Sequence, residues 1–231
     1  KYPQTIVYRS DKNLGFAGAN NIGIKISKGN LLFFLNNDTL IIRDSLSPFL
    51  KKLNEINIAG ISPIILNNDN ELSIQFAGYS KLTSITLRNR AITEIDEQKK
   101  SIKTEFLHGA AMLFKKEAID KVGLMNEDYF LYYEEFDWCE KFKKYGYELY
   151  LEPSFSVIHK NSGSIGLNSP LKAYYLTRNR LLFAYNNCSN YNLFFIILYH
   201  LCIAYPFHII KALISGKLNI AKAELKGIID F

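Results

Sequence analysis

The chain has 231 residues, 48% of them apolar, so it is long and apolar enough to bury a sizeable core, which argues against disorder. Its three cysteines are odd in number and scattered, which argues against a disulfide framework and favours a reducing compartment. The net charge of +6 is uneven. Residues 1–140 hold 17 basic and 18 acidic side chains, whereas residues 141–231 hold 11 and 4.

Short apolar runs alternate with helical patterns over the first 150 residues, which predicts an α/β domain with a mostly parallel sheet flanked by helices. The run at 31–35 shows no polar alternation, as is typical of a strand covered on both faces. Residues 67–104 are predicted to form a hairpin and loops, and the pattern turns helical from about Leu171. The predicted strands are 5–8, 31–35, 58–62, 110–114 and 147–151, the last closed by Pro153; the predicted helices are 19–27, from Asp44 or Ser45 to 54, 116–122 and 134–145.

The tripeptide Asn36-Asn37-Asp38 directly follows the apolar run at 31–35. Ligands of open α/β sheets bind beyond the carboxyl ends of strands, and one carboxylate there can hold a hard divalent ion together with phosphate oxygens. A simple turn at the end of the strand is the other interpretation, because Asn and Asp favour turns.

A glycine-containing loop, Asn13–Gly18, precedes the first predicted helix and opens the motif Asn13-Leu14-Gly15-Phe16-Ala17-Gly18-Ala19-Asn20-Asn21-Ile22-Gly23. Its glycines allow close backbone approach to a ligand, and the helix N-terminus favours an anion. The loop has neither the Rossmann glycine spacing nor the lysine of a P-loop, so a helix-entry loop without a ligand stays open.

Three carboxylates, Glu134, Glu135 and Asp137, fall in the first turn of the helix predicted at 134–145. The helix dipole stabilises them as anions, and an ionised carboxylate at the edge of a site can take a proton from an attacking hydroxyl. An acidic first turn that serves helix stability alone is the common alternative.

His159 ends a short apolar segment, and His108 precedes Gly109. A lone histidine is usually structural, but His159 becomes a candidate ligand if Asp38 holds a metal. The same ambiguity applies to His108.

Taken together and in order, these motifs resemble the family-two inverting glycosyltransferases of A-type fold, particularly their rhamnosyltransferase-like branch. The resemblance runs from about Tyr2 to Arg180. Its matched parts are the glycine loop, the strand ending in Asn36-Asn37-Asp38-Thr39, the segment Gly109–Ala118, the acidic helix start, His159 and the segment Tyr174-Tyr175…Arg178-Asn179.

The resemblance implies a role for each matched residue. Asp38 would be the metal ligand, with Mg²⁺ or Mn²⁺ bridging to the diphosphate of a sugar donor, and His159 a further ligand. Glu135 would be the catalytic base, with Asp137 as its rival because the family usually carries an Asp where Glu135 stands. The implied substrate-binding residues are Asn13, Gly15, Gly18, Asn20, Asn36, Asn37, His108 and Gly109.

The resemblance also implies the reaction, which is sugar transfer from a nucleotide-diphospho-sugar to a saccharide or lipid-linked acceptor with inversion, in cell-surface polysaccharide synthesis. Members of the family normally begin with strands that bind the nucleobase. We therefore expect about 40–50 further residues of that kind before Lys1. The resemblance divides the chain into an N-terminally incomplete catalytic domain, 1–170, and a helical, basic and apolar region, 171–231.

Residues 193–210 are mostly apolar and are flanked by basic residues. An apolar helix in basic surroundings suits an anionic membrane surface better than nucleic acid, and a core helix is the alternative. We expect a cytoplasmic protein, peripheral at the inner face of a bacterial plasma membrane. Two other functions stay open, a binding or scaffold module that has lost catalysis and, ranked last, a metal-dependent hydrolase.

Overall fold

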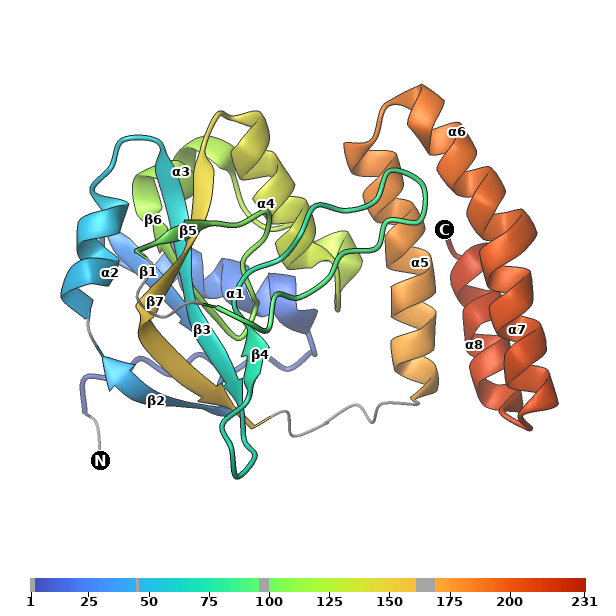
Figure 1. The fold of residues 1–231 in the computed structure, drawn as a ribbon, viewed down its shortest axis with the longest axis horizontal. Helices are drawn as coiled ribbons and strands as arrows, with labels where there is room; N and C mark the ends of the chain where they lie inside the picture. Colours follow the sequence, from blue (N-terminus) through green and yellow to red (C-terminus); the bar gives the residue numbers. More distant parts are fainter. Residues whose placement is uncertain (1–2, 45, 96–99, 161–168) are drawn as a thin grey trace.

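The computed structural model of the chain describes residues 3–44, 46–95, 100–160 and 169–231. Figure 1 shows two parts, a sheet covered by helices and a group of C-terminal helices beside it. The predicted α/β class and the helical C-terminal region are therefore confirmed. The predicted caps Asp44 and Ser45 lie outside what can be described, Ser45 altogether and Asp44 in its side chain.

Among the described residues the sheet has the strand order β1-β6-β3-β7-β2, with β4 beside β3 and β5 beside β7. Its strands are β1 (Leu31–Leu35), β2 (Thr39–Asp44), β3 (Ile58–Asn67), β4 (Ile74–Phe76), β5 (Ile102–Lys103), β6 (Ala111–Lys115) and β7 (Glu148–His159). The helices around it are α1 (Gly15–Ile26), α2 (Leu46–Leu53), α3 (Lys116–Val122) and α4 (Glu134–Lys144), together with the short 3₁₀ turn η1 (Glu127–Tyr129).

The strand directions differ from the expected mostly parallel sheet. Of the pairs among described strands, β3–β7 is parallel, whereas β1–β6, β6–β3, β3–β4, β2–β7 and β5–β7 are antiparallel. An unbroken apolar run indicates cover on both faces and says nothing about direction. In β1 even that cover is one-sided, because Leu32 and Phe34 are buried while Leu31, Phe33 and Leu35 are about 40% exposed.

The strand predicted at residues 5–8 does not form. Ile6, Val7 and Tyr8 are 60–74% exposed, and no described strand pairs with them. Helix α1 begins at Gly15, four residues earlier than predicted, so most of the glycine loop is helix.

The strand β7 runs through Pro153, which was predicted to end it. The pairing with β3 jumps from Pro63 opposite Glu152 to Ile64 opposite Ser156. This bulge leaves the proline outside the ladder, where its missing N–H costs no hydrogen bond. The extension matters because it carries the strand on to His159.

Two apolar clusters fill the two faces of the sheet. On one face Phe114 stacks on Phe142 and lies tilted against Trp138, under α1, α3 and α4. On the other, Phe49 of α2 packs against Phe155 of β7. The sheet is thereby held rigid from both sides, which fixes the positions of its strand ends.

The C-terminal helices are α5 (Pro170–Asn187), α6 (Asn190–Tyr199), α7 (Tyr205–Ile214) and α8 (Leu218–Ile229), with a π-helical turn, η2 (His200–Ala204), between α6 and α7. In Figure 1, α6 and α7 form one long rod on the outside, with α5 between the rod and the sheet. A third cluster, with Tyr129, Phe183 and Ile196 among its members, joins these helices to the turn before α4. The turn is therefore held from the C-terminal side.

A substitution at Gly60 in β3 tests how tightly the sheet packs against its helices. A Cβ at this position would lie 2.5 Å from the ring of Phe114, which is fully buried. We expect Gly60→Ala to lower the free energy of unfolding by about 1–3 kcal/mol, measured by urea denaturation.

The matched control is Gly23→Ala in α1, where a Cβ would meet no described atom within 4 Å. This change should raise stability by up to about 1 kcal/mol, since alanine favours the helix. Equal effects of the two substitutions would contradict the packing described for Gly60.

Candidate active site

Asp38 and His159 meet where β2 begins and β7 ends. Thr39 lies opposite His159 in the antiparallel ladder, and the Lys160 N–H donates to the Asp38 carbonyl at 3.0 Å. The side chains approach each other, with His159 Nε2 at 3.4 Å from Asp38 Oδ1. The two residues predicted as metal ligands, which are 121 positions apart, are thus brought together.

This pair fits a divalent metal ion. Asp38 Oδ1 is buried, and within the described residues it has no partner with hydrogen-bond geometry. A carboxylate oxygen and an imidazole nitrogen are both suitable ligands for Mn²⁺. The described part of the chain holds no cluster of three or more His, Cys, Asp or Glu side chains, so the pair suits an ion whose other ligands come from a substrate or from water.

Gln75 and His108 lie beside His159, and Tyr79 lies beyond His108. The Oε1 atom of Gln75 lies 3.3 Å from His159 Nδ1, and the His108 ring centroid lies 5.9 Å from that of His159. Tyr79 stacks on His108 at 6.3 Å. Gln75 and Tyr79 come from the segment 67–104, whose sequence pattern predicts a hairpin and loops without revealing either residue.

His108 is held as a neutral imidazole. Burial first, and then the neighbouring His159, lower the pKa of His108 to about 4. Its Nδ1 accepts a hydrogen bond from the Ala110 N–H at 3.1 Å, so the proton of the neutral ring resides on Nε2. His108 can therefore donate a hydrogen bond without carrying a charge.

The acidic start of α4 lies beyond Tyr79. Burial raises the pKa of Glu135 from 4.5 to about 7. Burial and then the Glu135 carboxylate raise the pKa of Glu134, which is only 3% exposed. Glu135 in turn helps to raise the pKa of Tyr79, whose ring packs edge-on against Phe136, the residue after Glu135, at 5.3 Å. A carboxylate with a pKa near 7 is matched to proton transfer at neutral pH.

The turn that leads into α4 is strained. Phe130, Tyr132 and Tyr133 have φ angles of 61°, 67° and 75°, a region that non-glycine residues avoid. The Asn179 side chain of α5, which is fully buried, donates from Nδ2 to the carbonyls of Tyr129, Leu131 and Tyr132 at 2.8–2.9 Å. One amide group from the C-terminal helices thus holds the turn that presents Glu134 and Glu135.

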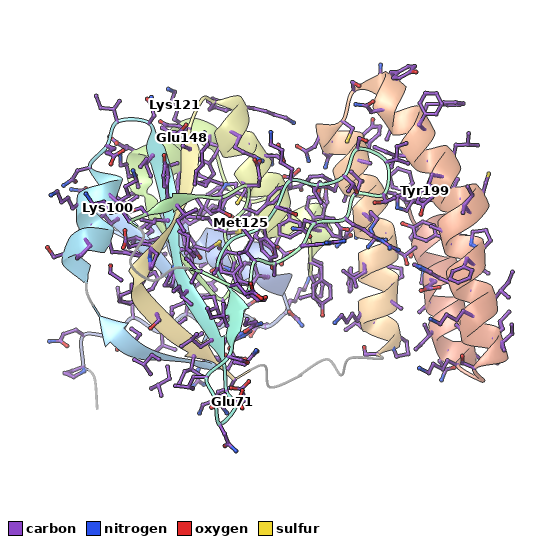
Figure 2. All side chains as sticks on the ribbon, viewed as in Figure 1. Glu71, Lys100, Lys121, Met125, Glu148 and Tyr199 are labelled. Carbon is purple, nitrogen blue, oxygen red and sulfur yellow. The ribbon has the colours of Figure 1, made fainter. Side chains whose placement is uncertain are left out.

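The glycine loop clamps the same turn from the other side. The Phe16 N–H donates to the Phe130 carbonyl at 2.8 Å, and a Cβ on Gly15 would lie 2.2 Å from that oxygen. Buried Asn21 exchanges hydrogen bonds with the backbone of Met125, which Figure 2 labels near the middle of the molecule. Only glycine at position 15 allows this approach, so the loop has a structural role that its motif did not reveal.

Asp137 faces away from this line of residues. It is fully buried, accepts hydrogen bonds from Tyr129 Oη at 3.2 Å and Asn187 Nδ2 at 2.8 Å, and lies 3.0 Å from Lys141 Nζ. These contacts tie α4 to α5. An acceptor could reach this carboxylate only by displacing them.

The other predicted substrate-binding residues lie along α1 and next to the ends of strands. Asn13 and Gly15 line a recess of about 410 Å³ along α1, and Asn20 lines a second of about 420 Å³ beside β1. Asn36 forms the turn before Asp38, where its carbonyl accepts from Thr39. Gly109 packs under the Phe16 ring, since a Cβ there would lie 3.4 Å from it, and a Cβ on Gly18 would lie 3.5 Å from Glu127. Asn37, in the same turn as Asp38, is exposed.

The chain has a mixed α/β fold, with polar and titratable side chains gathered where its strands end. Residues 1–123, slightly more than half of the chain, match the family Glycosyl transferase family 2. The chain belongs to this family.

Two curated relatives are similar over most of the chain. A dTDP-rhamnosyl transferase of Shigella flexneri, RfbF, is 27% identical over 194 residues, which are 76% of this chain and 62% of the relative. A low-salt glycan biosynthesis hexosyltransferase of Haloferax volcanii, Agl10, is 25% identical over 186 residues, which are 75% and 58%. The matched part of the chain thus spans about three fifths of the length of these relatives.

Among solved structures, GalNAc-T7 in complex with UDP, GalNAc and Mn²⁺ superposes with a TM-score of 0.57. The match covers 87% of this chain and 45% of GalNAc-T7, at 14% sequence identity. The likeness supports the A-type glycosyltransferase fold.

Asn179→Ala tests how the turn is held. The two Nδ2 hydrogens of the Asn179 amide are shared among three carbonyls of strained backbone. Losing them should lower the free energy of unfolding by about 1–3 kcal/mol, measured by urea denaturation. The matched control is Asn192→Ala on the exposed side of α6, which should change stability by less than about 0.5 kcal/mol. Two equal effects would show that the turn does not depend on Asn179.

The raised pKa values of Glu134 and Glu135 predict how stability changes with pH. Between pH 6.5 and 8.5 the folded chain loses protons that the unfolded chain, with carboxyl pKa values near 4.5, has already released. The free energy of unfolding should therefore fall by about 2 kcal/mol as pH rises through this window. The lowered pKa of His108 acts below pH 6.5 and does not interfere.

Urea denaturation at pH 6.5 and 8.5 measures this effect, and Glu134→Gln is the control because it removes the titrating group at nearly constant shape. The slope should be shallower in Glu134→Gln. A wild-type stability that is flat or rises over this window would contradict the burial described for the two carboxyl groups.

Proposed function

We propose that this chain transfers a sugar from a nucleotide-diphospho-sugar to a hydroxyl of a saccharide or lipid-linked acceptor, with inversion at the anomeric carbon. The observation that carries the proposal is the line of ring contacts from the Asp38–His159 pair through His108 and Tyr79 to Phe136, which follows Glu135 in α4. This line supports a site that binds the diphosphate at one end and carries the catalytic base at the other.

Glu135 is the base in this proposal. Its carboxylate takes the proton of the acceptor hydroxyl as the acceptor oxygen forms a bond to the anomeric carbon. The bond from that carbon to the diphosphate oxygen breaks on the opposite face, and its electron pair leaves with the nucleoside diphosphate. Asp137 was the rival for this role, and its contacts with Tyr129, Asn187 and Lys141 support a structural one instead.

Asp38 and His159 would hold Mg²⁺ or Mn²⁺ in this proposal. When bound, the ion would supply positive charge that stabilises the departing diphosphate. Neutral His108 would orient a substrate oxygen through its Nε2 proton, and Gln75 would fix the ring of His159 from the side away from Asp38. The solved relative with UDP and Mn²⁺ supports this use of a metal.

The relatives guide the choice of substrates. We propose a nucleoside-diphosphate hexose donor, with dTDP-rhamnose as the first to be assayed, and a role in bacterial cell-surface polysaccharide synthesis.

We propose that residues 1–170 carry the transfer site and that residues 171–231 brace it through Asn179, with the protein at the cytoplasmic face of the membrane. Asn13, Gly15, Gly18, Asn20, Asn36, Asn37 and Gly109 would shape the donor pocket.

The test compares Glu135→Gln with Asp137→Asn. With a donor panel, Mn²⁺ and a hydroxyl acceptor, Glu135→Gln should lower kcat by about 10²–10⁴-fold and leave stability at neutral pH nearly unchanged. Asp137→Asn should chiefly lower the free energy of unfolding, by about 1–3 kcal/mol. Full activity in Glu135→Gln together with lost activity in folded Asp137→Asn would move the base to Asp137.

Measurements of donor binding and turnover distinguish an active transferase from a binding or scaffold module that has lost catalysis. Asp38→Ala should weaken Mn²⁺-dependent binding of the nucleoside diphosphate by at least about tenfold in calorimetric titrations. Metal-dependent donor binding without turnover of any donor by the wild-type chain would support the scaffold interpretation. Binding that needs no metal and survives Asp38→Ala would refute the proposed role of Asp38.

A further inference from the structure

The rod formed by α6, η2 and α7 has an exposed apolar side. Among the described residues the stretch Asn190–Ile214 is long and apolar enough, by length and composition, to cross a membrane, yet only 22% of its most apolar window is buried. In Figure 2 some side chains of this stretch project from the side of the rod that faces away from the rest of the molecule. The side chains of what we call the outer face, each at least 40% exposed, are Tyr191, Phe194, Phe195, Leu198, Leu201, Ile203, Phe207, Ile210, Leu213 and Ile214.

The π-helical turn aligns this face along the whole rod. Leu198 and Ile210 are twelve residues apart, so in an uninterrupted α-helix they would point about 120° apart. The extra residue of a π turn removes about 100° of that difference. Both side chains are about half exposed, whereas His200 and Ala212, also twelve apart, are both buried. The turn thus keeps one apolar side outward and one side against the molecule.

The inner side is fixed to the other C-terminal helices. The Tyr205 hydroxyl donates to the Thr177 carbonyl of α5 at 2.9 Å, and His200 is 1% exposed. A rod bound in this way cannot turn its inner side to lipid without breaking these contacts. The outer face is therefore available as it stands.

The charge around the outer face favours an anionic partner. No Asp or Glu occurs between Glu152 and Glu224, and the same segment holds seven Lys and Arg residues. Exposed Lys211, Lys217 and Lys222 follow the apolar run on α7 and α8. In a pair of identical chains joined through this face, these cations would add repulsion, whereas anionic headgroups would neutralise them.

We propose that the outer face lies in the plane of an anionic lipid bilayer, with its apolar side chains among the acyl chains and its lysines at the headgroups. An exposed apolar helix face flanked by lysines is the pattern of interfacial helices. The inference does not depend on the proposed sugar transfer, because vesicle binding needs no substrate.

Flotation with phosphatidylglycerol–phosphatidylcholine vesicles tests the proposal. The full chain should float with these vesicles at low salt, and Phe207→Glu/Ile210→Glu should lower the partition coefficient at least about tenfold. The control is Ile56→Glu, which changes an 89% exposed isoleucine in the loop before β3 and should bind as the wild type does. Circular dichroism verifies that each variant is folded.

If the wild-type chain is folded but stays in the dense bottom fraction at low salt, without floating with the vesicles, the proposal is overturned. So would a lipid-free dimer, seen by sedimentation velocity, that Phe207→Glu/Ile210→Glu dissociates while vesicle binding is absent. Lys217→Glu/Lys222→Glu should weaken binding to phosphatidylglycerol vesicles and make it less dependent on salt. Unchanged binding in that variant would refute the role given to the charges.

The depth of a fluorophore in the bilayer distinguishes a rod that lies in the membrane plane from one that spans the membrane. Cys202 is exposed on the rod and Cys139 is buried. In a Cys188→Ser variant a fluorophore can therefore be attached at position 202. Phe194→Cys and Ile210→Cys, each in a chain lacking Cys188 and Cys202, report on the two ends. Similar shallow depths at all three positions are expected. A deep centre with ends at opposite surfaces would mean that the rod spans the bilayer and would overturn the in-plane arrangement.

Discussion

The amide of Asn179 is the contact on which the site depends. It satisfies three carbonyls of a turn in which three non-glycine residues have positive φ angles, and Phe16 fixes the same turn from the opposite side. Strained backbone of this kind persists only where its surroundings hold it. Through this turn the C-terminal helices and the glycine loop together determine where the acidic start of α4 lies.

The opposite end of the site is built by the sheet. The bulge at Pro153 lets β7 continue to His159, and the antiparallel pairing with β2 sets His159 beside Asp38. Half-buried His108 and Tyr79 lie between that pair and the start of α4. Loss of water in this packing raises the pKa of Tyr79 and of Glu135 and lowers the pKa of His108. The unusual pKa values therefore follow from the same packing that joins the two ends.

The sequence predicted most elements and singled out Asp38 and His159, which lie together in the structure, but it did not predict the strand directions or the hydrogen bonds that hold the turn before α4. Apolar periodicity located α3 to the residue and β1 to the residue, because both depend on local pattern. It missed that β7 passes Pro153, since a bulge depends on the neighbouring strand. The sequence also did not reveal Gln75, Tyr79 or the hydrogen bonds from Asn179 to three carbonyls. Each of these side chains contacts residues that are distant in sequence, so no short spacing marks it.

The most direct test of the account is a crystal structure with Mn²⁺ and a non-transferable analogue of the donor, in which anomalous scattering locates the metal. The account predicts Mn²⁺ within bonding distance of Asp38 and His159, and the Glu135 carboxylate facing the anomeric carbon on the side away from the diphosphate. Metal bound elsewhere, or Asp137 facing the anomeric carbon in place of Glu135, would contradict it.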